Sequence, residues 1–379
     1  MKTGTFKGGL DYDIFSVNEV NTPIEELPPP SEVTIPLKQH KGKECKAVVK
    51  KGQEVKIGQV IGEGSGPKEP PVHATVSGKV TQVIKRFPDI RGRYVSAVTI
   101  ESDGKNEWAT LPEEKTDYLQ KGPEELLSLI EKAGVVDFGI EAVPISSKLS
   151  VIKDKSVNII IVNGIDTEPF LNAGKRLILE EAQDIAEGIK VLKKVSGVSS
   201  IYFAIEDRNT ELKDKIFSAI SGVAELAILK AKFPQAVDRL LIKAVLEREV
   251  PSPYGIPEDI GVSVFGVEAV LAILDAVRKG KPVIDRYITI TGAVKKPLTL
   301  NVAIGTPVKE LIKLAGGVTV KDFVVINGGP MMGKIVDLEN EYVTKTTTGI
   351  IVLPREHFIA KKKTENLSLI HISEPTRPL

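Results

Sequence analysis

The middle of the chain alternates between strand-like and helix-like segments, and this alternation restricts the possible folds more than any other feature. Apolar strand-like runs cover Val157–Gly164 and Ile201–Asp207. Between them, apolar residues at helical spacing predict one long helix from about Lys175 to Lys194, and the run ELAILKAKF predicts a third strand. Strands that alternate with helices form a parallel sheet covered on both faces. We therefore expect a central Rossmann-like parallel α/β domain over residues 106–285.

This sheet predicts where ligands would bind. In open α/β sheets, ligands lie beyond the carboxyl ends of the strands, where the strand order reverses. The segments that follow two of the predicted strands, 163–168 and 206–208, are therefore the candidate ligand loops. Asp207 and Arg208 in the second loop are interpreted as a solvated pair, and Glu258 with Asp259 as a loop or helix cap.

The two flanks of this domain have other periodicities. Residues 38–101 contain short alternating runs broken by Gly, Pro and Asp, which predict an all-β barrel-sandwich; with a preceding three-proline strap it forms an N-terminal domain over 1–105. Residues 286–340 contain a strand pair, a short helix and another strand, which is typical of a β-grasp module. A last strand and a linker are expected over 341–366. The fold class is thus α/β multidomain.

The barrel-sandwich pattern resembles biotinyl and lipoyl carrier modules. Such a carrier displays its modified lysine at the tip of a hairpin, and Lys68 is close to that place. The surrounding residues, GSGPKEPP, predict an irregular proline-rich loop instead. We therefore expect no swinging-arm role for Lys68.

Composition argues against several classes of function. The 51 Lys and Arg residues and the 50 Asp and Glu residues leave a net charge of +1, which argues against nucleic acid as a partner. Cys45 is the only cysteine, and the four histidines lie far apart, so we expect no metal site and a buried, unreactive thiol. No apolar run approaches the roughly 18 to 20 residues that cross a bilayer. No Ser/His/Asp or paired-carboxylate spacing supports hydrolysis.

The final residues differ from the rest of the sequence. Residues 367–379, LSLIHISEPTRPL, resemble the translated end of a transposon-type sequencing adapter. This interpretation ends the natural sequence at Asn366 and predicts that the real protein continues beyond it.

Several motifs occur in a distinctive order along the chain. They are FKGG, LPPPSEVTIPLKQHKG, PVHATVSGKV, NGIDTEPFL, KFPQAVDRLLIKAV, REVPSPYGIPEDIGV and NGGPMMG. With these motifs the chain resembles, from about Phe6 to Asn366, the RnfC family of the Rnf complex, the membrane-bound ferredoxin:NAD⁺ oxidoreductase that moves Na⁺ or H⁺. The resemblance implies a β-grasp module of the soluble-ligand-binding (SLBB) type. We expect this module to be architectural, with Met331 and Met332 filling a gap in the core.

The resemblance also implies cofactors, partners and location. Family members continue with two CxxCxxCxxxCP motifs, so two [4Fe-4S] clusters are expected only in a segment beyond Asn366. The implied partners are other Rnf-type membrane subunits, with ferredoxin or NADH as redox partner. The implied location is the cytoplasmic face of the cell membrane, where the protein is bound peripherally.

The α/β domain of the family resembles the flavin subunit of respiratory complex I, in which a glycine-rich loop cradles FMN and NADH. The family loop is approximately GxxGxGGAxFPTxxK, and residues 134–148 here are GVVDFGIEAVPISSK. Such loops need glycine because side chains would keep the backbone away from a phosphate or a flavin ring. The residual cofactor-binding positions that the resemblance implies are Gly134, Gly139, Lys148, Asn163 and Glu168.

Three positions of this loop depart from the family pattern. Asp137 and Ile140 replace glycines, and Glu141 replaces a small residue. We therefore expect that the chain does not bind FMN and NADH in the usual manner, has no catalytic residue, and acts as a docking and iron–sulfur relay subunit. The alternatives are a working FMN-dependent NADH-oxidising subunit, a cobalamin-reductase-type subunit of a microcompartment, and an interaction scaffold without redox centres.

Overall fold

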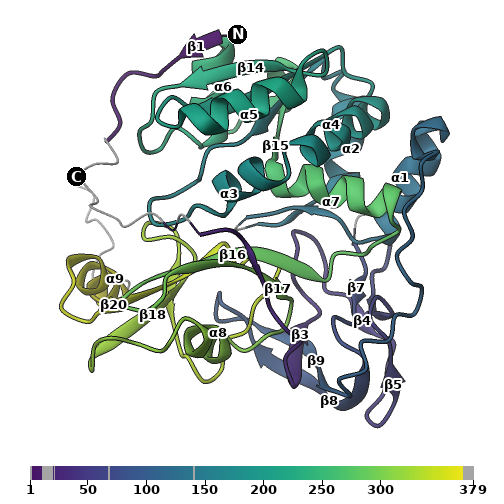
Figure 1. Cartoon of the computed structure of the whole chain (residues 1–379), viewed down its shortest axis with the longest axis vertical. Coiled ribbons are helices and arrows are strands. Elements are labelled where there is room, and N and C mark those ends of the chain that lie inside the picture. The colour runs from purple at the N-terminus through teal and green to yellow at the C-terminus, as the bar shows by residue number, and fades with distance from the viewer. Residues whose placement is uncertain (1, 11–19, 21, 67–68, 140, 370–379) are drawn as a thin grey trace, which may run out of the picture.

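The computed structural model describes residues 2–10, 20, 22–66, 69–139 and 141–369, and the side chains as far as residue 364. In the view of Figure 1 the α/β domain lies at the top, the β-grasp module at the lower left and the barrel-sandwich at the lower right. Lys68 and Ile140 lie outside the described residues.

A five-stranded parallel sheet forms the centre of the α/β domain. Its strands lie in the order β1 (Lys2–Gly4), β14 (Glu225–Leu229), β13 (Ser200–Glu206), β12 (Ile159–Asn163) and β15 (Val262–Gly266). All four neighbouring pairs are parallel. The alternating pattern predicted β12, β13 and β14, but not β15. Strand β1 was not predicted. Its Lys2 pairs with Ala227, so the start of the chain belongs to this sheet and not to the barrel-sandwich.

Helices cover both faces of this sheet. On one face lie α1 (Pro123–Lys132), α2 (Ile145–Asp154), α3 (Ala173–Glu180), α4 (Ala182–Ser196), α5 (Thr210–Ile220) and α7 (Val267–Arg278), and on the other lies α6 (Asp238–Leu246). Along β12, Ile160 and Val162 pack into the hydrophobic cluster on the face covered by the six helices, and Ile161 packs into the cluster on the face covered by α6. This is the two-residue alternation of a strand that is buried on both sides.

The prediction of a single helix from Lys175 to Lys194 is wrong. The structure has two helices, α3 and α4, which meet at Glu181, where φ is −117° and ψ is 26°. Neither proline nor glycine marks the break. The neighbouring Glu180 carboxylate accepts hydrogen bonds from the Ile24 backbone, at 3.1 and 3.2 Å, and pairs with Arg176. Contacts with a segment more than 150 residues away therefore hold the helix end.

The barrel-sandwich consists of two small sheets. One holds β3 (Glu32–Pro36), β9 (Tyr94–Ser102), β8 (Gly78–Pro88) and β5 (Glu54–Val55), and the other holds β4 (Lys46–Ala47), β6 (Val60–Glu63) and β7 (Val72–His73). Gly78 has φ +151°, and a Cβ there would lie 1.9 Å from the Glu101 carbonyl oxygen. The start of β8 therefore requires glycine.

The β-grasp module extends beyond the expected boundary at residue 340. Its strands lie in the order β19 (Lys334–Val336), β18 (Phe323–Asn327), β20 (Gly349–Pro354), β16 (Asp285–Gly292), β17 (Leu298–Ala303) and β2 (Glu25–Glu26), with helix α8 (Val308–Leu314). Strand β20 lies in the middle of this sheet, so it is part of the module. The expected linker after it forms helix α9 (Phe358–Leu369), which crosses the predicted end of the natural sequence at Asn366.

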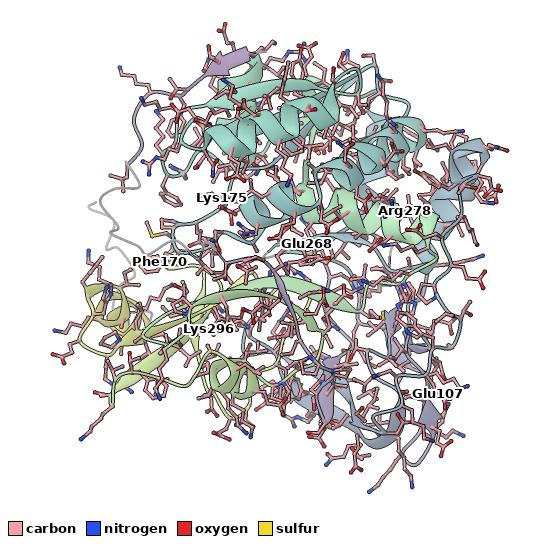
Figure 2. All side chains as sticks on the ribbon, viewed as in Figure 1. Glu107, Phe170, Lys175, Glu268, Arg278 and Lys296 are labelled. Carbon is pink, nitrogen blue, oxygen red and sulfur yellow. The ribbon has the colours of Figure 1, made fainter. Side chains whose placement is uncertain are left out.

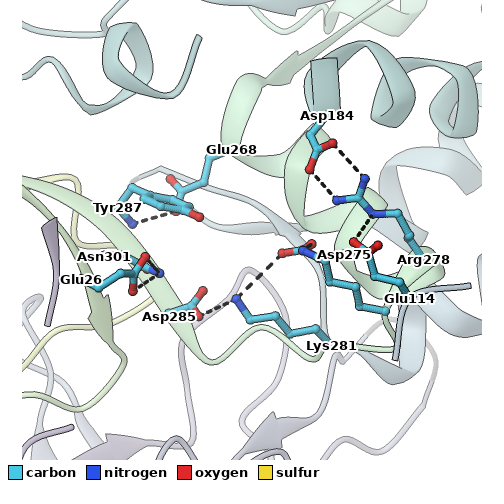
Figure 3. A network of polar contacts seen from close by, with 11 residues as sticks. Glu26, Glu114, Asp184, Glu268, Asp275, Arg278, Lys281, Asp285, Tyr287 and Asn301 are labelled. Carbon is cyan, nitrogen blue, oxygen red and sulfur yellow. Dashed lines mark hydrogen bonds and ion pairs between the residues drawn. The ribbon is translucent and has the colours of Figure 1, made fainter. Parts of the chain in front are cut away.

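Buried polar contacts join the modules. Arg286 at the start of β16 is 2% exposed and donates to both carboxylate oxygens of Glu268 in α7, at 2.7 and 3.0 Å. Figure 2 shows Glu268 where α7 faces β16. Close by, Lys281 after α7 lies 2.6 Å from Asp285 of β16, and Arg278 pairs with Asp184 within the α/β domain (Figure 3). The α/β domain and the β-grasp module therefore share a charged interface.

The barrel-sandwich and the α/β domain share one hydrophobic core. Ile35 and Ile100 of the barrel-sandwich belong to the same buried cluster as Ile145 and Phe265 of the α/β domain. Among the described residues, no helix combines the length and the apolar character that crossing a membrane requires.

Candidate functional site

The strand order places the candidate site between β12 and β15. Strand β12 has β13 on one side and β15 on the other, so the order reverses beside it. The last residues of the two strands, Asn163 and Gly266, are direct partners in the ladder. Helix α7 begins immediately after Gly266. The carboxyl ends of these strands are where open α/β sheets bind ligands.

Lys148 of α2 lies at this end of the sheet, and its amine is bound by other residues of the chain. Its side chain is 14% exposed, and its Nζ is 2.5 Å from the Asp137 carboxylate. The same Nζ donates to the carbonyl oxygen of Val264 and lies 4.4 Å from the centre of the Phe265 ring. A cation over an aromatic face and beside a carboxylate is stabilised by both. Lys148 is therefore bound by the chain itself.

Asp137 connects Lys148 to the start of α7. One of its oxygens binds Lys148, and the other accepts a hydrogen bond of 3.0 Å from the Gly266 N–H. Gly266 is the N-cap residue of α7. A helix N-terminus and a lysine together favour an anion, and here the anion is the Asp137 carboxylate. The short antiparallel pair β10 (Val136–Asp137) and β11 (Val143–Pro144) holds Asp137 in this position.

The charges of two further carboxylates, Asp238 and Glu258, also act on Lys148. Burial lowers the pKa of Lys148, whereas the negative charges of Asp137, Asp238 and Glu258 raise it. The second effect is larger, so the pKa of Lys148 lies above its usual value. Glu258 accepts a hydrogen bond of 2.8 Å from the Ser263 hydroxyl. Asp137 contacts Lys148 directly, whereas Asp238 and Glu258 act on it only through their charge. Asp238 and Glu258 were not predicted as site residues, because they are distant in sequence from residues 134–148.

The other positions of the flavin-type loop make contacts of their own. Gly134 has φ +69°, and a Cβ there would lie 2.6 Å from the Pro71 carbonyl oxygen, so packing against the barrel-sandwich requires this glycine. Gly139 has φ +137° with open space around it. Glu141 was expected to stand in the cofactor pocket, but its half-exposed side chain pairs with Lys41 at 2.7 Å. Of the two carboxylates introduced into this loop, only Asp137 contacts Lys148.

Asn163 and Glu168 do not join Lys148. The Asn163 amide donates to the Ala236 carbonyl at 3.1 Å and accepts from the Ile165 N–H at 3.0 Å, which closes the loop after β12. Glu168 is 6% exposed and accepts hydrogen bonds from the backbone N–H groups of Met331 and Met332, at 2.5 and 3.0 Å. It therefore links the α/β domain to the GGPMMG loop of the β-grasp module.

The two methionines of that loop do not fill the core. The side chains of Met331 and Met332 are 40% and 62% exposed, against the expectation from sequence. The Glu168 bonds explain this difference, because they fix the loop by its backbone. Gly329 adds to the fit: a Cβ at this position would lie 2.4 Å from the Glu168 carboxyl carbon.

Lys345 is a buried lysine that the sequence pattern did not predict. It is 2% exposed, and its Nζ donates to the Gly134 carbonyl oxygen at 2.7 Å. The pKa of Lys345 is lowered to about 8, chiefly by burial. Cys45 opposes this shift, and the positive charge of Arg286 adds to it. Burial also raises the pKa of the Cys45 thiol to about 11, in agreement with the expected unreactive cysteine. Among the described residues, no group of three or more His, Cys, Asp or Glu could hold a metal ion.

Family models match the three modules in order. Residues 4–105 match the RnfC barrel sandwich hybrid domain, residues 130–275 match the Nuo51 FMN-binding domain, and residues 287–334 match the SLBB domain. These matches agree with the three-module fold class.

Curated relatives match nearly the whole chain. The RnfC-type subunit of the proton-translocating ferredoxin:NAD(+) oxidoreductase complex of Clostridium ljungdahlii is 35% identical over 353 residues, which are 93% of this chain and 77% of the relative. The corresponding subunit of the Na(+)-translocating complex of Acetobacterium woodii is 35% identical over 366 residues, which are 94% and 81% of the two chains. The chain belongs to the RnfC family.

The family membership confirms the resemblance seen in the sequence motifs. A more distant relative, from the ion-translocating oxidoreductase complex of Rhodobacter capsulatus, is 31% identical and covers 93% of this RnfC-family chain and 69% of its own length. Among solved structures, an air-oxidized NAD+-reducing [NiFe]-hydrogenase matches with a TM-score of 0.52 and 16% identity, covering 62% of this chain and 47% of the hydrogenase chain. At that identity the likeness concerns the fold alone.

Proposed function

We propose that this chain is the RnfC subunit of a membrane-bound Rnf-type electron transport complex. In this role it carries electrons between ferredoxin or NADH and the membrane subunits, and it is bound peripherally on the cytoplasmic face of the cell membrane. The support is the family membership and the names of the relatives, which are subunits of ferredoxin:NAD(+) oxidoreductase complexes. Its partners are the other subunits of such a complex.

Iron–sulfur clusters carry the electrons in this proposal. A [4Fe-4S] cluster needs four thiolate ligands, and Cys45 is the only cysteine among the 379 residues. We therefore place the two clusters in a segment C-terminal to residue 366. The relatives have additional length that could hold such a segment, because the chain covers 77% and 81% of the first two.

The α/β domain acts in this proposal as a docking unit that does not bind FMN and NADH in the usual manner. The observation that carries this is the Asp137 carboxylate between Lys148 and the N-terminus of α7. An anionic cofactor would have to displace this carboxylate. It would then meet the charges of Asp238 and Glu258 as well. Like charges in a partly buried site disfavour each other strongly.

Equilibrium titration with FMN tests this part of the proposal. We expect the wild-type chain to leave FMN fluorescence unquenched at stoichiometric concentrations. The variant Asp137→Gly restores the family residue and frees Lys148, so it should quench FMN more strongly than the wild type. Asp322→Asn is the control, since Asp322 lies in an exposed pair with Arg355. Tight, stoichiometric quenching by the wild type would overturn the proposal.

A working FMN-dependent NADH-oxidising subunit is the second candidate. The match of residues 130–275 to the Nuo51 FMN-binding domain favours it. This function requires Asp137 to leave Lys148 when FMN binds. In that case the wild type itself would bind FMN stoichiometrically, and NADH would bleach the bound flavin.

A further inference from the structure

A cavity whose wall contains several charged side chains lies between the barrel-sandwich and the β-grasp module. Its volume is about 180 Å³. Three segments form its walls: residues 36–42 after β3, residues 87–93 at the turn between β8 and β9, and residues 340–346 before β20. Glu141 closes one side. No part of the Lys148 site lines this cavity, so it is distinct from the site described above.

The basic residues of the wall are not fully neutralised by its acids. Lys41 pairs with Glu141 at 2.7 Å, and Arg93 donates to Asp89 at 2.8 and 2.6 Å. Lys38 also lines the cavity, and no ion pair is formed by its amine with a described residue. Burial lowers the pKa of Lys38, and the positive charge of Arg93 lowers it further. The charges of Glu44 and Glu69 act in the opposite direction, so Lys38 has acidic neighbours but no direct ion pair with a described residue.

The remaining acid in the wall opposes an anion only weakly. Glu341 accepts a hydrogen bond of 2.6 Å from the Asn327 amide. Burial raises its pKa to about 7, with smaller contributions from Asp337 and Asp89, while Asn327 lowers it. At neutral pH a large fraction of this carboxyl group is therefore protonated and uncharged.

Groups that recognise hydroxyls surround the same space. Thr344 and Thr346 line the cavity with their hydroxyl oxygens 2.9 Å apart, and Tyr342 lines it beside Phe87. His40 is 5% exposed, and its Nε2 is buried without a hydrogen-bond partner among the described residues. A buried polar atom without a partner is unfavourable. Because this atom has almost no accessible surface, a ligand in the cavity would not reach it, and the hydroxyl-binding groups are those of Thr344, Thr346 and Tyr342.

We infer that this cavity binds a small hydroxylated anion. Lys38 binds the carboxylate or phosphate of the ligand, and Thr344 and Thr346 bind its hydroxyl groups. The volume of about 180 Å³ corresponds to about a dozen waters at roughly 15 Å³ each, which suits a molecule of about ten non-hydrogen atoms. Because the walls come from two modules, the ligand also holds the barrel-sandwich against the β-grasp module.

Isothermal titration calorimetry with two probes tests this inference. Citrate supplies hydroxyl and carboxylates, and glycerol 3-phosphate supplies hydroxyls and a phosphate. Glycerol and sodium chloride at matched ionic strength are the neutral and salt controls. We expect saturable binding of at least one probe at or below about 1 mM, accompanied by a rise in melting temperature. The probe that binds identifies the anionic group.

Variants place the binding in this cavity. Lys38→Gln should weaken binding of the active probe about tenfold, as expected for losing a charged partner. Lys309→Gln should bind like the wild type, because Lys309 pairs with Glu339 on an exposed surface. If Lys38→Gln does not fold, Thr346→Val provides the same comparison. The inference is overturned if neither probe binds the wild type at about 1 mM, or if the cavity variants bind as well as Lys309→Gln.

Discussion

Asp137 shows how one residue can change the chemistry of a site while the fold is retained. It replaces a glycine of the family loop, yet its carboxylate is held by Lys148 and by the N–H of Gly266, the N-cap residue of α7. The two charged side chains are 14% and 16% exposed, so solvent screens their attraction only in part. The pair stabilises the same structural elements that a bound anion would stabilise.

A double-mutant cycle measures the strength of this pair. We expect Asp137→Asn and Lys148→Met each to lower the free energy of unfolding, because each leaves a partly buried charge without its partner. The double variant should be more stable than the sum of the two losses predicts, with a coupling energy of roughly 1 to 3 kcal/mol. Urea unfolding of the four proteins provides the measurement. Additive effects would mean that the two groups do not interact in solution.

Lys345 predicts a pH dependence of stability. Its pKa falls from 10.5 to about 8 on folding, so between these values the unfolded chain binds more protons than the folded chain. Stability from this group therefore rises with pH from about 8 to 10.5, by about 3 kcal/mol in total. The variant Lys345→Met removes this contribution and serves as the reference.

The difference in unfolding free energy between wild type and Lys345→Met should increase in favour of the wild type between pH 7 and pH 10.5. Urea unfolding at several pH values measures it. A difference that stays constant across this range would show that the amine titrates normally in the folded protein.

At the level of elements, β1 illustrates what a local sequence pattern does not contain. Its three residues pair with β14, more than 200 positions later, and no local signal links the two segments. The runs that became β12, β13 and β14 were predictable, because buried parallel strands are continuously apolar. The break between α3 and α4 was not, since neither proline nor glycine marks it and the contact beside it, Glu180 with Ile24, comes from a distant segment.

Gly4 provides a test of β1. A Cβ at Gly4 would lie 2.0 Å from the Ala244 carbonyl oxygen, so Gly4→Val should detach β1 from the sheet. Amide hydrogen exchange should then become faster in β14, while β12 and β13 stay protected. Lys2→Val is the matched control, because Lys2 is exposed in the same strand. Unchanged exchange in β14 of Gly4→Val would contradict the pairing.

At the scale of the whole molecule, the three modules behave as one unit because their contacts are buried. The barrel-sandwich shares a core with the α/β domain, and Glu168 and Arg286 join the α/β domain to the β-grasp module. Sequence periodicity identified each module, but it could not show these contacts. The exposed Met331 and Met332 and the buried Lys345 are contrary to their usual preferences, because tertiary bonds to Glu168 and Gly134 decide their positions.

The Glu268–Arg286 pair should determine how cooperatively the modules unfold. Glu268→Gln leaves the buried Arg286 guanidinium with an uncharged partner, which costs about 3 to 5 kcal/mol when a buried pair is broken. We expect a lower melting temperature and a separate transition of the β-grasp module in differential scanning calorimetry. The exposed-pair variant Asp322→Asn should melt like the wild type. An unchanged single transition in Glu268→Gln would show that this pair does not couple the modules.

The flavin content of the purified chain tests the central claim most directly. The protein is expressed and purified with excess FMN, freed of unbound flavin, and denatured, and the released flavin is counted per chain. With Asp137 bound to Lys148, we predict far less than one FMN per chain and no absorbance change on adding NADH. One FMN per chain, bleached by NADH, would contradict the claim that this carboxylate has closed the site.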